Sequence, residues 1–184
     1  MMMTRGGEAS EQTRENLKQA FLEIYATKPI ERISIREITD RAGYNRATFY
    51  LHFRDIYDVL ESIEAELLSS IDAITGPLES KADLYARMGT FLSLASRCTF
   101  SFTVLLGEKG DPAFVARFKQ RLEPLLGRLL VMRPGLDEHR RQLVASFYLS
   151  GLVAVVVEWL RDPQGMGVDD LVRFMVDDVL QAHV

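Results

Sequence analysis

Apolar residues recur along this chain at the spacing of an α-helix, and the strict alternation of a β-strand is almost absent. Near the start, Leu17, Phe21 and Ile24 keep the interval that places side chains on one face of a helix. Similar stripes continue to the end of the chain, separated by glycine or proline. The pattern predicts an all-α protein with helices over residues 11–27, 34–42, 46–53, 55–74, 84–95, 100–106, 112–129, 137–160 and 168–182.

Local signals predict where several of these helices begin and end. Ser34 and Glu37 have the spacing of a capping box, in which the serine oxygen accepts from the amide of residue 37 and the glutamate reaches back. Gly43 suits a left-handed helix end, and Asn45 is a good N-cap for the helix that follows. Pro124 should kink or break its helix, because it lacks an amide hydrogen.

The short helix over 46–53 carries the most informative pattern. Eight residues are marginal as an isolated helix, so Phe49 and Phe53 should anchor it to the two preceding helices. The opposite side would then carry Arg46, Ala47, Tyr50 and Leu51. Two short helices joined by a glycine turn, the second with such a face, are typical of a helix-turn-helix, which places one helix in the major groove of DNA.

Charge is distributed unevenly along the chain, whose net charge is −4. Residues 1–54 carry nine Lys/Arg and seven Asp/Glu, whereas residues 55–184 carry thirteen and nineteen. The segment with the predicted helix-turn-helix is therefore mildly basic and the remainder acidic. A difference of this size does not by itself predict DNA binding.

Composition limits the compartment and the class of protein. With 47% apolar residues the chain can bury a core, and its one cysteine, Cys98, fits a reducing cytoplasm. Residues 1–10 lack the apolar segment of a secretory signal, and we expect them to form a disordered tail. The apolar run 147–160 is short for a bilayer and is interrupted by Glu158, so we interpret it as a buried helix.

Signatures of catalysis and metal binding are missing from the sequence. We find no Walker loop, dinucleotide fingerprint, zincin pair or nucleophile elbow. The three histidines are not spaced with carboxylates or Cys98 as metal ligands would be. We therefore expect no enzyme activity, no metal site and no cofactor.

The predicted helix-turn-helix supplies groups for both parts of DNA recognition. Arg46 can bond the O6 and N7 of guanine, and Ala47 is small enough for close approach and can touch a thymine methyl. Hydroxyl, imidazole and basic side chains nearby can bond phosphates. The candidate DNA-binding residues are Ser34, Arg36, Tyr44, Asn45, Arg46, Ala47, Thr48, Tyr50, Leu51, His52 and Arg54.

The run Phe49-Tyr50-Leu51-His52-Phe53-Arg54, with Ile33–Ile38 and Ala42–Tyr44 before it, resembles the DNA-binding domain of TetR-family transcriptional regulators. The hallmark of that family is an aliphatic or aromatic residue, Tyr, any residue, His, Phe and usually a basic residue. Arg54 stands where lysine is usual, and Tyr44 where valine is common. The resemblance implies an all-α homodimer, in which the last two long helices of each subunit form a four-helix interface. It also implies that a ligand in the C-terminal domain changes the separation of the two DNA-reading helices.

We accordingly predict an N-terminal three-helix DNA-binding domain over 11–56 and a C-terminal bundle for dimerisation and ligand binding over 57–184. The helix over 143–160 is apolar on nearly all sides and must be covered on all sides. A second subunit would provide that cover, although the central helix of a monomer would show the same pattern. The candidate interface residues are Leu152, Val155, Val156, Val172, Met175 and Val179.

Aromatic and sulfur-containing residues in the C-terminal part suit the wall of a pocket for a small molecule, although core packing uses the same residues. The candidates are Met88, Phe91, Phe102, Phe118, Phe147, Tyr148 and Trp159. The sequence thus predicts a cytoplasmic, homodimeric repressor that a small-molecule effector releases from a near-palindromic operator in double-stranded DNA. An activator or regulator controlled by a protein partner is the alternative.

Overall fold

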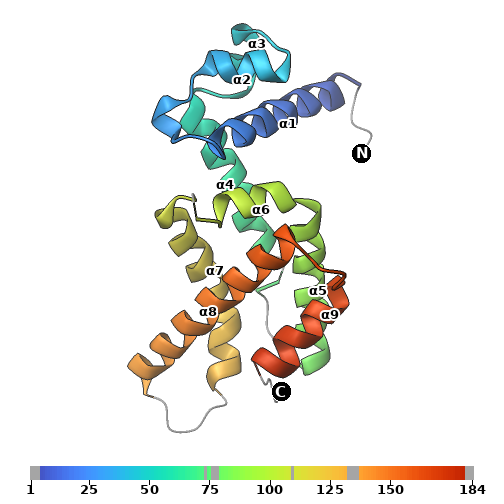
Figure 1. Ribbon diagram of the computed structural model, residues 1–184, viewed down its shortest axis with the longest axis vertical. Coiled ribbons are helices and arrows are strands. Elements are labelled where there is room, and N and C mark those ends of the chain that lie inside the picture. Colours follow the sequence, from blue (N-terminus) through green and yellow to red (C-terminus); the bar gives the residue numbers. More distant parts are fainter. Residues whose placement is uncertain (1–4, 73, 76–78, 109, 132–136, 181–184) are drawn as a thin grey trace. The chain divides into compact units, whose positions relative to one another are not determined.

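The computed structural model describes residues 5–72, 74–75, 79–108, 110–131 and 137–180, and within these ranges it contains helices and no strands (Figure 1). The predicted all-α class is confirmed. The chain divides into two compact units, Met1–Ala65 and Glu66–Val184, hereafter unit 1 and unit 2. The division falls inside a helix, whereas the sequence placed the domain boundary after residue 56.

Unit 1 contains α1 (Arg5–Tyr25), a 3-10 turn η1 (Ile30–Arg32), α2 (Ile35–Ala42), α3 (Arg46–His52) and the first part of α4 (Ile56–Asp72). Residues 5–10 are helical, which corrects the prediction of a disordered tail through residue 10. Good helix formers such as Glu8 and Ala9 extend α1 beyond its apolar stripe, and the Thr13 hydroxyl donates to the Ala9 carbonyl at 2.9 Å.

The core of unit 1 brings together one face from each of its four α-helices. Leu17 and Phe21 of α1, Ile38 of α2, Phe49 of α3 and Val59 of α4 are fully buried. Leu17 and Phe21 lie four residues apart on α1, as the sequence pattern predicts. The short helix α2 packs on α1, and α3 packs on α2, so both are held by packing rather than by their own propensity.

Unit 2 contains α5 (Lys81–Arg97), α6 (Thr99–Leu105), α7 (Pro112–Val131), α8 (Glu138–Arg161), α9 (Val168–Arg173) and the π-helical segment η2 (Phe174–Val179). α7 packs along α8, and α9 packs along α5 (Figure 1). The predicted break at Pro124 is wrong, because α7 runs through it. The proline is exposed, so the carbonyl that loses its amide partner on this side of the helix can bond to water.

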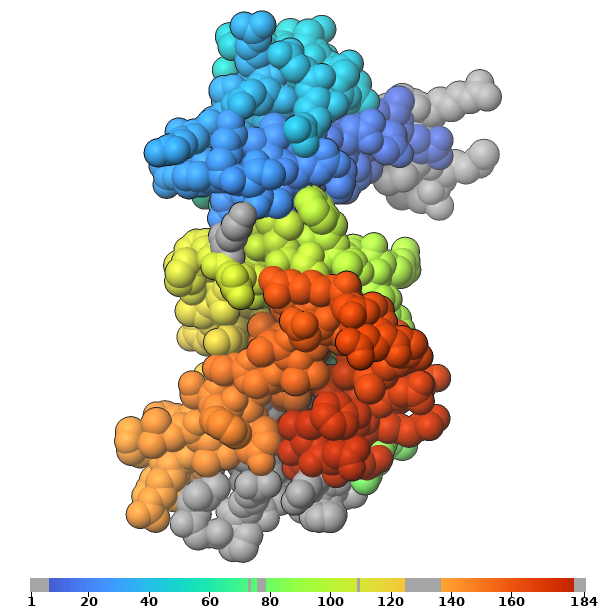
Figure 2. Space-filling view, viewed as in Figure 1, coloured from blue at the N-terminus to red at the C-terminus, as the bar shows by residue number. Residues whose placement is uncertain are grey.

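α8 is long and apolar enough to cross a membrane by length and composition alone. One of its faces, however, is buried against the rest of unit 2 through residues such as Ala145, Leu149 and Val153. A core helix has this one-sided burial. The opposite side of α8 is uncovered, and α8 (orange) occupies much of the visible surface of unit 2 in Figure 2.

Candidate nucleic-acid interface

The N-terminus of α2 is fixed by a complete capping box. The Ser34 oxygen accepts from the Glu37 amide at 3.3 Å, and the Glu37 carboxylate accepts from the Ser34 amide at 3.0 Å. Lys28 Nζ lies 2.5 Å from the other carboxylate oxygen. These bonds, that to Lys28 first, lower the pKa of Glu37 from 4.5 to about 2. The capping box thus also engages the Ser34 hydroxyl that the sequence suggested for DNA contact.

The turn between α2 and α3 depends on backbone conformation and on one long-range bond. Gly43 has φ of +77°, in the left-handed region that favours glycine. The next residue, Tyr44, accepts a hydrogen bond from Asn16 Nδ2 of α1 at 2.9 Å. Its hydroxyl proton remains available for a phosphate oxygen, while the bond to Asn16 holds the turn against α1.

α3 begins as the sequence predicts and presents the predicted face. Asn45 caps it by accepting from the Thr48 amide at 2.9 Å, and the Thr48 hydroxyl lies 3.2 Å from the same oxygen. Phe49 is 0% exposed, whereas Leu51 is 82% exposed. The other exposed side chains of this face are Arg46, Ala47 and Tyr50. His52, half-buried, lies beside the ring of Phe53.

The arginines of unit 1 differ in how far their charge is already neutralised. Within the part of the chain that the structure describes, Arg46 makes no ion pair or hydrogen bond through its side chain. Arg36 pairs with Asp40 at 3.4 Å. Arg54 lies 2.9 Å from Asp58, whose hydrogen bond raises the pKa of the guanidinium. Arg46 is therefore the predicted contact best able to give its donors to a base, and Arg54 must share its donors with Asp58.

Three positioning residues were not found by sequence reasoning. They are Asn16, which holds Tyr44, Lys28, which holds Glu37, and Arg14. Arg14 donates to Ser62 of α4 at 2.6 Å, and its guanidinium lies 5.1 Å from the centre of the Phe53 ring. Each bond joins residues that are distant in the sequence, so helical periodicity gave no signal for it.

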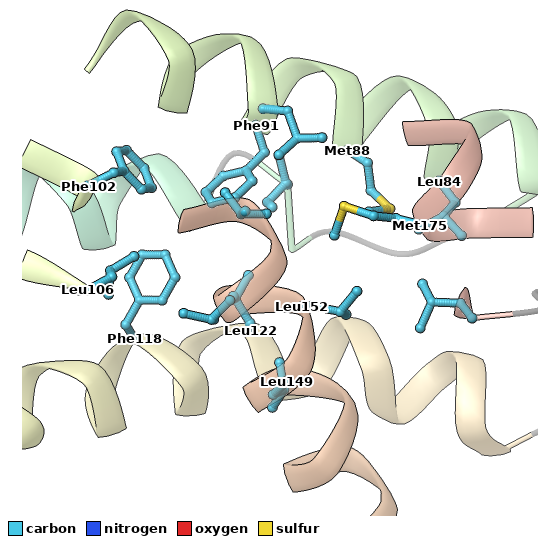
Figure 3. Close-up of a pocket in the computed structure, with 15 residues that line it drawn as sticks. Leu84, Met88, Phe91, Phe102, Leu106, Phe118, Leu122, Leu149, Leu152 and Met175 are labelled. Atoms are coloured by element: carbon cyan, nitrogen blue, oxygen red, sulfur yellow. The ribbon is translucent and has the colours of Figure 1, made fainter. Parts of the chain in front are cut away.

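Unit 2 contains a partly open apolar cavity of about 70 Å³ (Figure 3). Phe91, Phe102 and Phe118 meet there with ring centres 5.7–6.3 Å apart, and Met88 lies on the same wall. The full lining consists of Ile74, Leu84, Met88, Phe91, Leu92, Phe102, Leu106, Phe118, Leu122, Leu149, Leu152, Val153, Val156, Met175 and Leu180. Four of the residues predicted for a pocket thus share one cavity.

The other three predicted pocket residues do not line this cavity. Phe147 is 75% exposed, because it lies on the face of α8 opposite Leu149. Its neighbour Tyr148 is half-buried, and its ring contacts Phe147 at a centre distance of 5.7 Å. Trp159 donates from its indole nitrogen to the Met166 carbonyl at 2.9 Å, toward the loop before α9.

Most of the predicted interface residues are also corrected by the structure. Val156, Val172 and Met175 are buried within unit 2, and Leu152 lines its cavity, so packing within this chain already covers them. Val155 and Val179 are half-buried. The exposed large apolar residues of α8 are instead Leu143, at 58%, and Phe147. The sequence showed that α8 needed cover but not which face its own chain would cover.

Two segments of the chain match family models. Residues 19–63 match the model described as bacterial regulatory proteins of the tetR family, and residues 95–176 match a transcriptional regulator C-terminal region. The uncharacterized HTH-type transcriptional regulator YvdT of Bacillus subtilis is 32% identical over 72 residues, which are 39% of this chain. The match spans 37% of the length of that curated relative.

Solved structures share the fold over most of the chain. A TetR transcriptional regulator from Streptococcus agalactiae has a TM-score of 0.61 and 21% identity, with 91% of this chain and 93% of that one covered. A tetR-family regulator from Streptomyces coelicolor has a TM-score of 0.58 and 25% identity, with 94% and 81% covered. Fold and interface together define a helix-turn-helix regulator with a helical C-terminal unit. The chain belongs to the TetR family of DNA-binding transcriptional regulators.

Proposed function

We propose that this protein is a homodimeric repressor that acts in the bacterial cytoplasm and binds a near-palindromic operator until a small molecule occupies unit 2. The observation that carries the proposal is the exposed face of α3. Arg46 is exposed there and has no ion-pair or hydrogen-bond partner among the described residues, while the fully buried Phe49 holds the opposite side of the helix in the core. Because α3 is anchored in the core and the guanidinium of Arg46 is exposed, Arg46 is suited to bidentate hydrogen bonding with guanine.

The exposed side of α8 supports dimerisation. Leu143 and Phe147 lie one turn apart, and Gly151 and Ala154 continue the same exposed stripe. Small residues beside large apolar ones let two helices approach closely, and exposed apolar surface of this kind is typical of an interface. A dimer formed through this face would carry two copies of α3, as a near-palindromic operator with two half-sites requires.

Binding to DNA from the promoter of the protein's own gene tests the proposal. Fluorescence anisotropy at moderate salt should give a specific complex for the wild-type protein and a strongly weakened one for Arg46→Ala. Arg97→Ala is the matched control, since Arg97 is also an exposed arginine but lies at the end of α5 in unit 2. The absence of specific binding, or equal losses for the two variants, would contradict the assignment of α3.

Sedimentation tests the dimer separately from DNA binding. Phe147→Glu places a charge in the proposed interface and should shift the protein toward monomer. Phe100→Glu is the control, because Phe100 is 38% exposed but belongs to α6. A wild-type protein that sediments as a monomer at micromolar concentration would refute the proposed assembly.

The size of the cavity favours one alternative. At about 70 Å³ it is much smaller than the usual ligand pocket of roughly 300–1,000 Å³. Control by a protein partner would need no such pocket, and the protein would then be an activator or a partner-controlled regulator. Compounds that stabilise the protein and also release DNA would favour the first proposal, and a defined partner with no stabilising compound would favour the second.

A further inference from the structure

We infer that the cavity of unit 2 binds an uncharged, wholly apolar molecule, such as an unsubstituted ring or a short hydrocarbon. This inference names the class of effector and rests on the proposed function only for the effect of that molecule on DNA. Binding of the molecule is inferred from the geometry of the cavity alone. The wall of the cavity, the charges around it and its adaptability all point to the same ligand class.

Among the residues that the structure describes, the wall offers no side chain that could hold a polar ligand. All fifteen lining residues are Leu, Ile, Val, Met or Phe, contributed by α5, α6, α7, α8, η2 and the short connections beside them. A carboxylate or an ammonium group placed there would lose its hydration and gain no partner, which is strongly unfavourable. An apolar guest would replace empty space with dispersion contacts.

Several charged groups on the surrounding helices are paired with one another. Asp177 of η2 accepts from Lys81 Nζ at 2.8 Å and from the Tyr85 hydroxyl, both on α5. Arg121 of α7 lies 2.7 Å from Asp72. These pairs lower the pKa of Asp177 and raise that of Lys81, so both groups stay ionised and engaged with each other at neutral pH. A ligand charge that approached these groups would therefore compete with an existing pair.

Water is a poor occupant of the same space. The cavity exceeds the roughly 10–15 Å³ that one water needs, but a buried water also requires two to four polar partners. The described side chains of the wall supply none, so an apolar guest is favoured over water at this wall.

The wall can also adapt to a guest larger than the empty space. Met88 of α5 and Met175 of η2 lie close together at one part of the cavity in Figure 3. Methionine side chains are unbranched and change rotamer readily. A single ring can thus be admitted by movement of these two side chains without a change in the polarity of the site.

Toluene, benzoate and benzylamine provide matched probes, because they share one ring and differ in charge. With the full-length protein, toluene should raise the melting temperature and shift the methyl NMR signals of Met88 and Met175, and the two charged probes should do neither. Binding of a charged probe with similar affinity would overturn the inference. Failure of toluene to bind would overturn it as well.

Two matched valine-to-isoleucine substitutions on α8 make the test specific to the cavity. Val156→Ile adds a methylene to the wall and should weaken toluene binding about fivefold. Val157→Ile is the control, since Val157 is equally buried but does not line the cavity, and it should leave toluene affinity unchanged. Equal effects of the two variants would refute binding at this site. Toluene that binds without releasing operator DNA would uphold the ligand class and refute the effector role.

Discussion

Phe49→Ala should remove α3 from the folded protein, because this side chain is the main attachment of the helix. α3 has seven residues, fewer than an isolated helix needs to be stable. Phe49 is 0% exposed, and its ring centre lies 5.8 Å from that of Phe53. The substitution leaves a cavity in the centre of unit 1 and frees α3 from α1 and α2.

The expected loss is large relative to the stability of the unit. Truncation of a buried phenylalanine to alanine costs about 3–5 kcal/mol. Unit 1 spans residues 1–65, and at the usual 0.05–0.15 kcal/mol per residue it would hold about 3–10 kcal/mol. The variant therefore loses a large part of the stability of unit 1, and α3 opens before unit 2 is affected.

Hydrogen exchange resolved along the chain is the suitable assay, because it reports each unit separately. Trp159 lies in unit 2, so tryptophan fluorescence would report the wrong part of the protein. Amides of α3 should exchange much faster in Phe49→Ala, and operator binding should be lost. Leu51→Ala is the control, since an 82% exposed side chain should change stability by less than about 0.5 kcal/mol. A loss below about 1 kcal/mol for Phe49→Ala, or unchanged operator affinity, would refute the anchoring role.

Three further predictions concern the same unit. Glu37 has a pKa of about 2 instead of 4.5, so its contribution to stability is present above pH 4.5 and is lost as the pH falls toward 2. In the Glu37→Gln variant, the urea midpoints at pH 7 and pH 3 should therefore lie closer together than in the wild-type protein. Ser34→Ala should lower the free energy of unfolding by about 1 kcal/mol through loss of the cap. Arg46→Ala should relax base preference, whereas Arg54→Ala should weaken binding evenly across sequences. Asp58 already neutralises part of the charge of Arg54. The loss of Arg54 should therefore change the slope of log K against log salt by less than the roughly 0.9 expected for a full phosphate contact, and anisotropy over a KCl series measures this slope. Replacing operator thymines by uracil should weaken wild-type binding more than that of Leu51→Ala, because the exposed leucine is placed to contact a thymine methyl; equal weakening of both would exclude that contact.

Local chemistry predicted the helix ends of unit 1 closely. The capping box at Ser34, the left-handed Gly43 and the Asn45 cap depend on residues within a few positions of one another, and all three are present. The four-residue spacing of Phe49 and Phe53 likewise identified the buried side of α3. Such signals are readable because a helix end or a helix face is determined by its own short segment.

Residues far apart in the sequence required the tertiary structure. Lys28 and Glu37, or Asn16 and Tyr44, form a pair only after the helices pack, and either member alone looks like an ordinary polar surface residue. Arg54 and Asp58 are only four residues apart, so their ion pair could have been predicted from the sequence. Arg54 was instead predicted only as a DNA contact.

By itself, the order of the amino acids determined that this protein is all-helical, where most of its helices lie and which face of α3 is exposed. Only the tertiary structure decided how the apolar surface of α8 is divided between the chain's own core and the outside. It placed Val156 at the cavity of unit 2 and left Phe147 uncovered, although both had looked equally suited to burial. The physical reason is that the hydrophobic effect depends on the area buried and not on which surface buries it. The sequence therefore determines how much apolar surface must be covered, whereas the packing of neighbouring helices determines what covers it.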